Sequence, residues 1–146
     1  MSMKPVSEII QQKGAMVLCV DHNQSVLEAI SLMAEVNIGA VLVKEHNEIA
    51  GIFTERDYLQ KIALKARSST ETPVKDVMSS PVVFAKPTDS VEECMEVMTN
   101  CRCRHLPVAD GNQLLGIVSI GDLVKIVVEA KQAEIEQLNQ YIAGSY

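Results

Sequence analysis

Apolar residues recur along this chain at two spacings, and the two spacings alternate. Short apolar runs bounded by polar turns, at residues 17–20, 38–43 and 49–54, predict strands. Apolar residues at helical spacing over residues 26–33 predict a helix, and a second helix is predicted from Asp57 to about residue 66. This order predicts a β-α-β-β-α unit whose last two strands pair with each other.

The whole pattern occurs twice, with an offset of 65 residues and no gap from residue 17 to residue 63. Ser25 and Glu28 form a capping box, in which a hydroxyl and a carboxylate bind the free N–H groups of a helix start, and it returns at Ser90. The first strand returns at residues 82–83. One unit is too small to bury a sufficient core. The sequence therefore predicts an α/β (α+β) fold of two repeats packed by pseudo-twofold symmetry, with two related clefts between them.

Both ends of the chain extend beyond the repeats. A short helix is predicted over residues 3–13, ending at Gly14, and the last helix continues into a tail with an apolar stripe of Ile135, Leu138 and Ile142. We expect the tail to pack on its own body or on a second chain. The predicted organisation is repeat 1 with its N-terminal helix (1–66), a polar linker (67–73), repeat 2 (74–128) and the helical tail (129–146).

Composition narrows the class of protein. The formal net charge is −6 and basic residues form no stripe, so nucleic acid is not an expected partner. No apolar run is long enough to cross a bilayer, and the N-terminus lacks the apolar segment of a signal peptide. Four cysteines without an export signal favour reduced thiols. We expect a cytoplasmic protein with no membrane partner.

The candidate chemistry lies in a motif that both repeats carry. Gly-Ile-Phe-Thr-x-x-Asp ends at Asp57 and Gly-Ile-Val-Ser-x-x-Asp ends at Asp122. Each motif predicts a strand that ends where a helix begins, and a helix N-terminus suits an anion or a sugar phosphate. Thr, Ser and Asp are also the preferred residues of a helix N-cap, so a purely structural role is the alternative. The presence of the motif in both repeats favours ligand binding.

These motifs resemble those of CBS domains, and the chain from Val6 to Val128 resembles a tandem pair of them (a Bateman module). His105-Leu106-Pro107-Val108 matches the apolar-x-Pro strand of the family, whereas the first repeat has Val41-Leu42-Val43 where proline is often found. The full pattern also resembles that of small stand-alone bacterial and organellar CBS-pair proteins. The resemblance implies an adenosine-containing ligand: AMP first, with ADP, ATP, NAD(H) and S-adenosylmethionine as alternatives.

The resemblance also implies where this ligand binds. Asp57 and Asp122 would accept hydrogen bonds from the ribose hydroxyls, and Arg104 and His105 would contact phosphate. We expect the two clefts to be unequal, because Arg56 stands in one where Gly121 stands in the other. The preferred Asp122 cleft comprises Ser119, Gly121, Asp122, Ile38, Gly39, Ala40, Leu18, Ile117 and Lys13. The Asp57 cleft comprises Thr54, Arg56, Asp57, Val83, Ile52, Cys103 and Arg104.

Two further signals are set aside. Cys101, Cys103 and His105 would lie on one side of an extended strand, but a structural zinc site needs a second ligand pair, so buried thiols and no metal are expected. No nucleophile lies in a catalytic motif, so we expect no enzyme.

Two functions stay open. The first is a sensor in which an adenine nucleotide shifts the conformational population and so modulates a protein partner. The second is a constitutive interaction module with vestigial clefts. Because CBS pairs commonly form flat dimers, a homodimer is expected, with the helices that follow Asp57 and Asp122 at its interface.

Overall fold

The computed structural model describes residues 4–14 and 17–144 and divides into two compact units. One unit is Met16–Val83, and the other combines Met1–Ala15 with Phe84–Tyr146. Each unit holds one of the two predicted repeats and has its own hydrophobic core.

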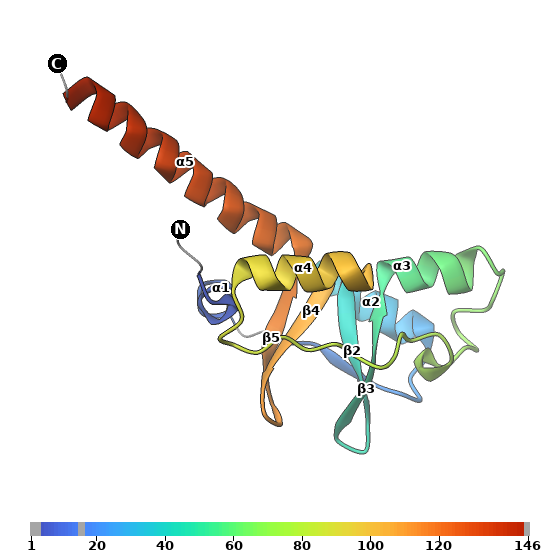
Figure 1. Cartoon of the computed structure of the whole chain (residues 1–146). Helices are drawn as coiled ribbons and strands as arrows, with labels where there is room; N and C mark the ends of the chain where they lie inside the picture. Colours follow the sequence, from blue (N-terminus) through green and yellow to red (C-terminus); the bar gives the residue numbers. More distant parts are fainter. Residues whose placement is uncertain (1–3, 15–16, 145–146) are drawn as a thin grey trace. The chain divides into compact units, whose positions relative to one another are not determined.

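The first repeat has the predicted β-α-β-β-α order (Figure 1). Its sheet has the order β1-β2-β3, with β1 parallel to β2 and β2 antiparallel to β3. The helix predicted to begin at Asp57 begins two residues earlier, because the side chain of Thr54 caps it. The elements are β1 (Cys19–Asp21), α2 (Val26–Val36), β2 (Ala40–Glu45), β3 (Glu48–Thr54), α3 (Glu55–Tyr58), the π-helical turn η1 (Leu59–Ala63) and the 3₁₀ turn η2 (Val74–Asp76).

The second repeat lacks one predicted strand. Residues 82–83 form none, and the equivalent of β1 is a single parallel bridge between Ala85 and Val108. Prolines at positions 81 and 87 have no N–H to donate, which limits the ladder on this side. The elements are α4 (Val91–Cys101), β4 (His105–Asp110), β5 (Gln113–Ser119) and α5 (Ile120–Gly144), with β4 antiparallel to β5.

The 65-residue offset holds in local detail. Ser25 and Ser90 cap α2 and α4 by accepting a hydrogen bond from the backbone N–H three residues later. Both helices end in a left-handed residue, Asn37 in one repeat and Arg102 in the other. The register of the hairpins shifts at the same place, after Val43 and after Val108. The predicted 65-residue repeat is therefore confirmed and extends to the bulges, although only the Ser90 cap is a complete capping box.

The N-terminal helix corrects the predicted grouping. Helix α1 (Val6–Lys13) does not belong with repeat 1 but packs against β5 of the second repeat. Its backbone is held there by hydrogen bonds from Val6 N to Asp89 O (2.8 Å) and from Val91 N to Lys4 O (3.0 Å). Chain order alone does not reveal which repeat a terminal helix covers.

The segment that precedes the second repeat is placed in the reciprocal way. Val74 is fully buried in the core of the first repeat, although it lies after the predicted linker. Ser79 forms a bridge with Ile52 on β3. The segment that precedes each repeat in the sequence therefore packs on the other repeat.

Candidate functional site

The Asp122 motif closes the junction between β5 and α5. Ser119 N donates to Asp122 Oδ2 (2.8 Å), and Asp122 N donates to Ser119 Oγ (3.1 Å). This reciprocal pair is a capping box. The motif therefore does stabilise the start of a helix, which is the structural role given above as the alternative to ligand binding. It uses only one oxygen of the carboxylate for the backbone.

Lys13, at the end of α1, meets the same carboxylate. Its Nζ lies 2.5 Å from Asp122 Oδ2 and donates to the carbonyl of Ile117 (3.0 Å). The contacts with Lys13 and Ser119 N both fall on Oδ2, and 27% of the Asp122 side chain is exposed. The carboxylate is therefore partly open to solvent beside a lysine.

The electrostatics of Asp122 follow from these contacts. Burial works to raise the pKa of this carboxyl, but the hydrogen bond from Lys13, those from Ser119 and the positive charge of Lys13 outweigh it. The net result is a pKa below the ordinary value for aspartate. Asp122 is therefore an anion at neutral pH, as a ribose acceptor needs to be.

The Asp57 motif has the same cap but a closed environment. Thr54 donates to Asp57 Oδ2 from its backbone N (3.0 Å) and its Oγ1 (3.1 Å). The other oxygen, Oδ1, accepts from Ser79 Oγ (2.9 Å) and pairs with Lys61 Nζ at 3.0 Å. Only 8% of the Asp57 side chain is exposed. Both oxygens of this carboxylate are already in use.

Several predicted residues gather at the Asp122 end of the second repeat. His105 begins β4 and pairs in register with Ser119, and the carbonyl of Arg104 accepts from Ile120 N (2.8 Å). The Arg104 side chain is exposed. A methyl group added at Gly121 would have only Ser119 Oγ near it, at 3.6 Å, so the space above Gly121 is open.

The other predicted residues lie in the first-repeat unit. Ala40 pairs with Thr54, and the carbonyl of Gly39 accepts from Glu55 N (3.1 Å), so both lie beside the Asp57 motif of their own repeat. That Leu18, Ile38, Gly39 and Ala40 also face Asp122 stays a prediction, and so does the place of Val83 in the Asp57 cleft. Arg56 is exposed on the first turn of α3.

Lys61 and Ser79 are contacts of the motif that the sequence prediction missed. Lys61 lies four residues after Asp57 on the same helical stretch, a spacing that brings opposite charges together. This spacing can be read from the sequence and could have predicted the ion pair. Ser79 comes from the segment that packs back onto the first repeat, and the sequence holds no sign of that contact.

The cysteine cluster differs from the prediction. Cys101 is the last residue of α4 and is exposed, and the left-handed Arg102 turns the chain before β4 begins. The expected extended strand over Cys101–His105 and the expected burial of Cys101 are therefore wrong. Cys94 is buried, and desolvation, reinforced by Asp89 and Glu93, raises its pKa to about 11. Among the described residues, no group of three or more His, Cys, Asp or Glu could hold a metal ion.

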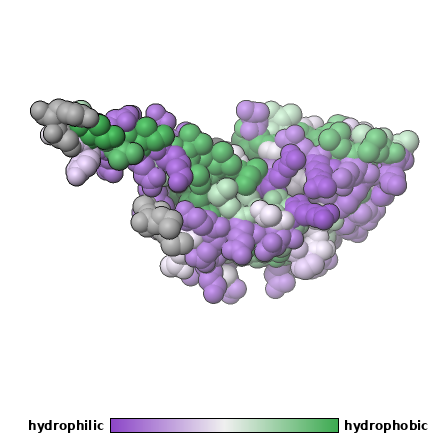
Figure 2. Space-filling model, turned by 45° about the horizontal axis from the view of Figure 1, so that its top comes forward, coloured by the Kyte–Doolittle hydropathy of each residue, from purple (hydrophilic) through white to green (hydrophobic). Residues whose placement is uncertain are grey.

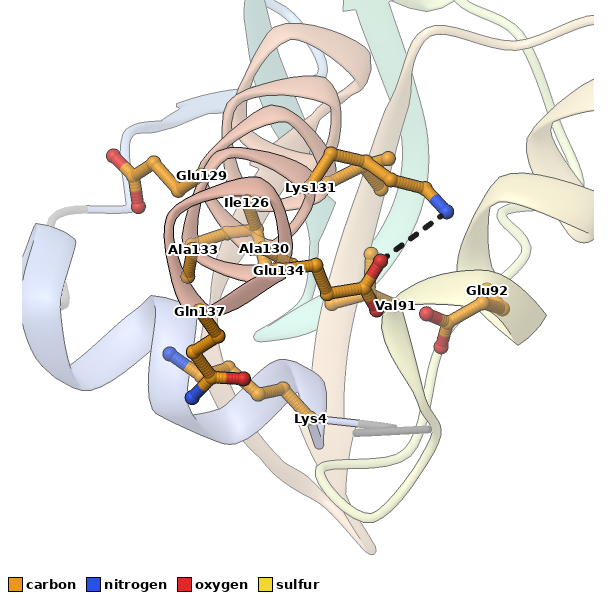
Figure 3. A pocket seen from close by; sticks show the side chains of 11 residues that line it. Lys4, Val91, Glu92, Ile126, Glu129, Ala130, Lys131, Ala133, Glu134 and Gln137 are labelled. Atoms are coloured by element: carbon orange, nitrogen blue, oxygen red, sulfur yellow. Dashed lines mark ion pairs between the residues drawn. The ribbon is translucent and has the colours of Figure 1, made fainter. Parts of the chain in front are cut away.

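A separate groove of about 500 Å³ runs between α5, the start of α4 and Lys4 (Figure 3). Its lining mixes Glu92, Glu129 and Glu134 with Lys131 and small apolar side chains. None of the predicted site residues lines it. We find no membrane-spanning candidate among the helices of residues 4–14 and 17–144.

Known proteins are similar to this chain in both sequence and fold. The CBS domain family profile matches residues 6–64 and 74–129. The mitochondrial CBS domain-containing protein CBSX3 of Arabidopsis thaliana is 37% identical over 97% of this chain and 73% of its own length. A solved CBS-domain protein of Burkholderia ambifaria is 46% identical, with a TM-score of 0.83 over 86% of this chain and 95% of its own.

Self-association occurs among such proteins. The hexameric CBS-CP12 protein of bloom-forming cyanobacteria is 28% identical, with a TM-score of 0.77 over 84% of this chain and 71% of its own. The family match covers both repeats and most of the sequence. This chain belongs to the CBS-domain family, of which it carries two copies in tandem.

Proposed function

We propose that this protein is a regulatory module that binds an adenosine-containing nucleotide at Asp122. The observation that carries the proposal is the exposure of this carboxylate: 27% of the Asp122 side chain is exposed while its Oδ2 caps the helix. An ionised carboxylate accepts hydrogen bonds from two vicinal hydroxyls, which is the arrangement that a ribose offers. Ser119, at the same helix start, adds a hydroxyl to the site.

Lys13 gives the site a preference for phosphorylated ligands. Its ammonium group is held by Asp122 and one carbonyl, and both are exchangeable because 39% of the lysine side chain is exposed. A phosphate beside the ribose competes for this cation, and Arg104 is a second exposed cation at the same end of the repeat. AMP and its higher phosphates should therefore bind more tightly than adenosine.

The proposed action is regulation and not chemistry. A nucleotide phosphate that binds Lys13 would break the ion pair between Lys13, the last residue of α1, and Asp122. The module would then favour a second conformation, which a protein partner binds with a different affinity. Differential affinity for the two states is sufficient, so no catalytic step is invoked. A cytoplasmic homodimer, as expected from the sequence, is the proposed setting.

A thermal-shift panel tests this proposal. Nucleotide-free protein would be heated with adenosine, AMP, ADP, ATP, NAD⁺, NADH and S-adenosylmethionine, because a ligand that binds only the folded state raises the melting temperature. We expect a shift with AMP or NAD(H) that is lost in Asp122→Ala. Asp110→Ala, which removes another carboxylate of the same unit, is the matched control and should keep the shift.

One observation favours the second function. Both aspartates cap helices and both pair with a lysine, so the motifs have a structural role that needs no ligand. A constitutive interaction module would give no shift with any compound of the panel. Asp122→Ala would then lower the melting temperature but change nothing else.

A further inference from the structure

Helix α5 continues far beyond the part of its own unit that covers it. Every residue from 128 to 144 is exposed, and Leu123 is the only buried residue that the helix contributes. The far end of α5 runs clear of the rest of its unit (Figure 1). Most of the stability of helices in proteins comes from the packing of an apolar face, so packing against a partner would stabilise this uncovered stretch. Of the two surfaces on which the tail is expected to pack, its own body does not cover these residues, and a second chain stays a prediction.

One face of this helix carries an apolar stripe. Hydrophobic residues follow α5 outward on the face that Figure 2 shows. The steps along the stripe alternate between four and three residues once Lys131 is counted as a member, which is the spacing of a coiled-coil seam. The apolar members are Val124, Val128, Ile135, Leu138 and Ile142, exposed by 44%, 58%, 52%, 59% and 47%.

We propose that this stripe, here called the α5 seam, packs antiparallel against the α5 seam of a second copy of the chain. A twofold interface presents the same patch from both subunits, and a narrow 3-4 stripe is complementary to itself. The opposite face of α5 carries Glu129, Glu136 and Gln140, and the seam is the face that gathers the exposed large aliphatic side chains of residues 128–144. The proposal does not depend on nucleotide binding.

Lys131 sets the orientation. It lies in the seam and forms an ion pair with Glu134, at 3.7 Å, on the same helix (Figure 3). A parallel pair would place Lys131 against the partner's Lys131 in one layer, which costs free energy. An antiparallel pair centred near residue 133 places Lys131 beside the partner's Glu134. Two lysines and two glutamates then surround the twofold axis that relates the two helices. The charges of this centre then cancel.

The same arrangement pairs the apolar residues. Antiparallel overlap centred near residue 133 places Val124 opposite the partner's Ile142, and Val128 opposite the partner's Leu138. Ile135 then covers the stem of the partner's Lys131, whose apolar carbons pack well along such a seam. All five apolar members of the seam gain a partner.

The first experiment measures mass in solution for the whole chain, by light scattering or sedimentation. Ile135→Glu with Leu138→Glu places two charges in the α5 seam, and we expect the mass of this variant to be half that of the wild type. Gln140→Glu places the same kind of charge on the opposite face and should keep the wild-type mass. Equal masses for the wild type and the double variant would overturn the proposal, as would a monomeric wild type.

The second experiment measures orientation. A nitroxide label at Ala143→Cys, in a chain whose four native cysteines are replaced by alanine, reports the distance between two copies. The antiparallel arrangement predicts a separation of about 30 Å, from about 1.5 Å per residue on either side of residue 133. A parallel pair predicts about 10 Å, the usual distance between helix axes, and that value would overturn the antiparallel arrangement. The mass comparison does not need the alanine variant and tests the seam alone.

Discussion

Gly51 and Gly116 begin the two copies of the motif, yet the space around them differs. A methyl group at Gly51 would lie 2.9 Å from the carbonyl oxygen of Ser79 and 2.5 Å from the sulfur of Met78. At Gly116 the three atoms nearest to the added methyl group all belong to the side chain of Ile10, the closest being its terminal carbon at 2.6 Å, and the end of an isoleucine can rotate away. The backbone carbonyl of Ser79 cannot move aside in the same way.

Gly51→Ala should therefore destabilise the protein more than Gly116→Ala. We expect Gly51→Ala to lower the free energy of unfolding by about 1–3 kcal/mol, the range for an overpacked site. Urea unfolding of both variants measures the difference. A larger loss for Gly116→Ala would show that the segment ending at Ser79 is not held against β3.

The pairing of Lys13 with Asp122 predicts a pH dependence. The folded state lowers the pKa of Asp122, so the pair contributes stability that is complete above the pKa of the unfolded chain, about 3.9, and is lost as the pH falls through the lower folded value. An exposed pair of this kind stabilises by about 0.2–1 kcal/mol.

Lys13→Met should raise the pKa of Asp122, because burial then acts with less compensation. NMR titration of the Asp122 carboxyl measures this shift directly. The difference in unfolding free energy between wild type and Lys13→Met should be constant near neutral pH and vanish in strong acid. A carboxyl that titrates identically in both proteins would mean that Lys13 does not hold it in solution.

Among the elements, α1 shows most clearly what the sequence could and could not predict. The repeats, their caps and the continuous α5 follow from spacing, because helix periodicity and capping boxes are local signals. The placement of α1 on β5 and of the Val74–Ser79 segment on β3 depends on contacts between distant residues, which no local pattern encodes. For the same reason Lys13, predicted only near the mouth of a cleft, is bonded to Asp122 itself.

This placement predicts which repeat responds when α1 is weakened. Ile9 is 5% exposed and belongs to the core of the second repeat. Ile9→Ala should lower stability by about 2–4 kcal/mol, as for other buried truncations. Hydrogen exchange should quicken in β4, β5 and the start of α5, while β1–β3 keep their protection. Faster exchange confined to β1–β3 would instead show that α1 packs against the first repeat.

For the whole molecule, two repeats of one plan carry two different aspartates. Asp57 accepts from Thr54, Ser79 and Lys61 with both oxygens and is nearly buried, whereas 27% of the Asp122 side chain is exposed. A buried carboxylate with several partners stabilises a fold, and releasing it for a ligand would cost those bonds. We therefore expect Asp57 to contribute mainly to the stability of the fold and Asp122 mainly to ligand binding.

Calorimetry should then find one nucleotide per chain. Asp57→Ala should lower the free energy of unfolding by about 1–3 kcal/mol, because it leaves Lys61 and Ser79 without a buried acceptor, while nucleotide affinity changes little. Asp122→Ala should abolish binding and destabilise the protein by only about 1 kcal/mol, the cost of a lost helix cap. Thr70→Ala, an exposed hydroxyl outside both motifs, is the neutral control. Two nucleotides per chain, or equal loss of affinity in the two aspartate variants, would show that the lysine and serine around Asp57 yield to a ligand as readily as Lys13 does.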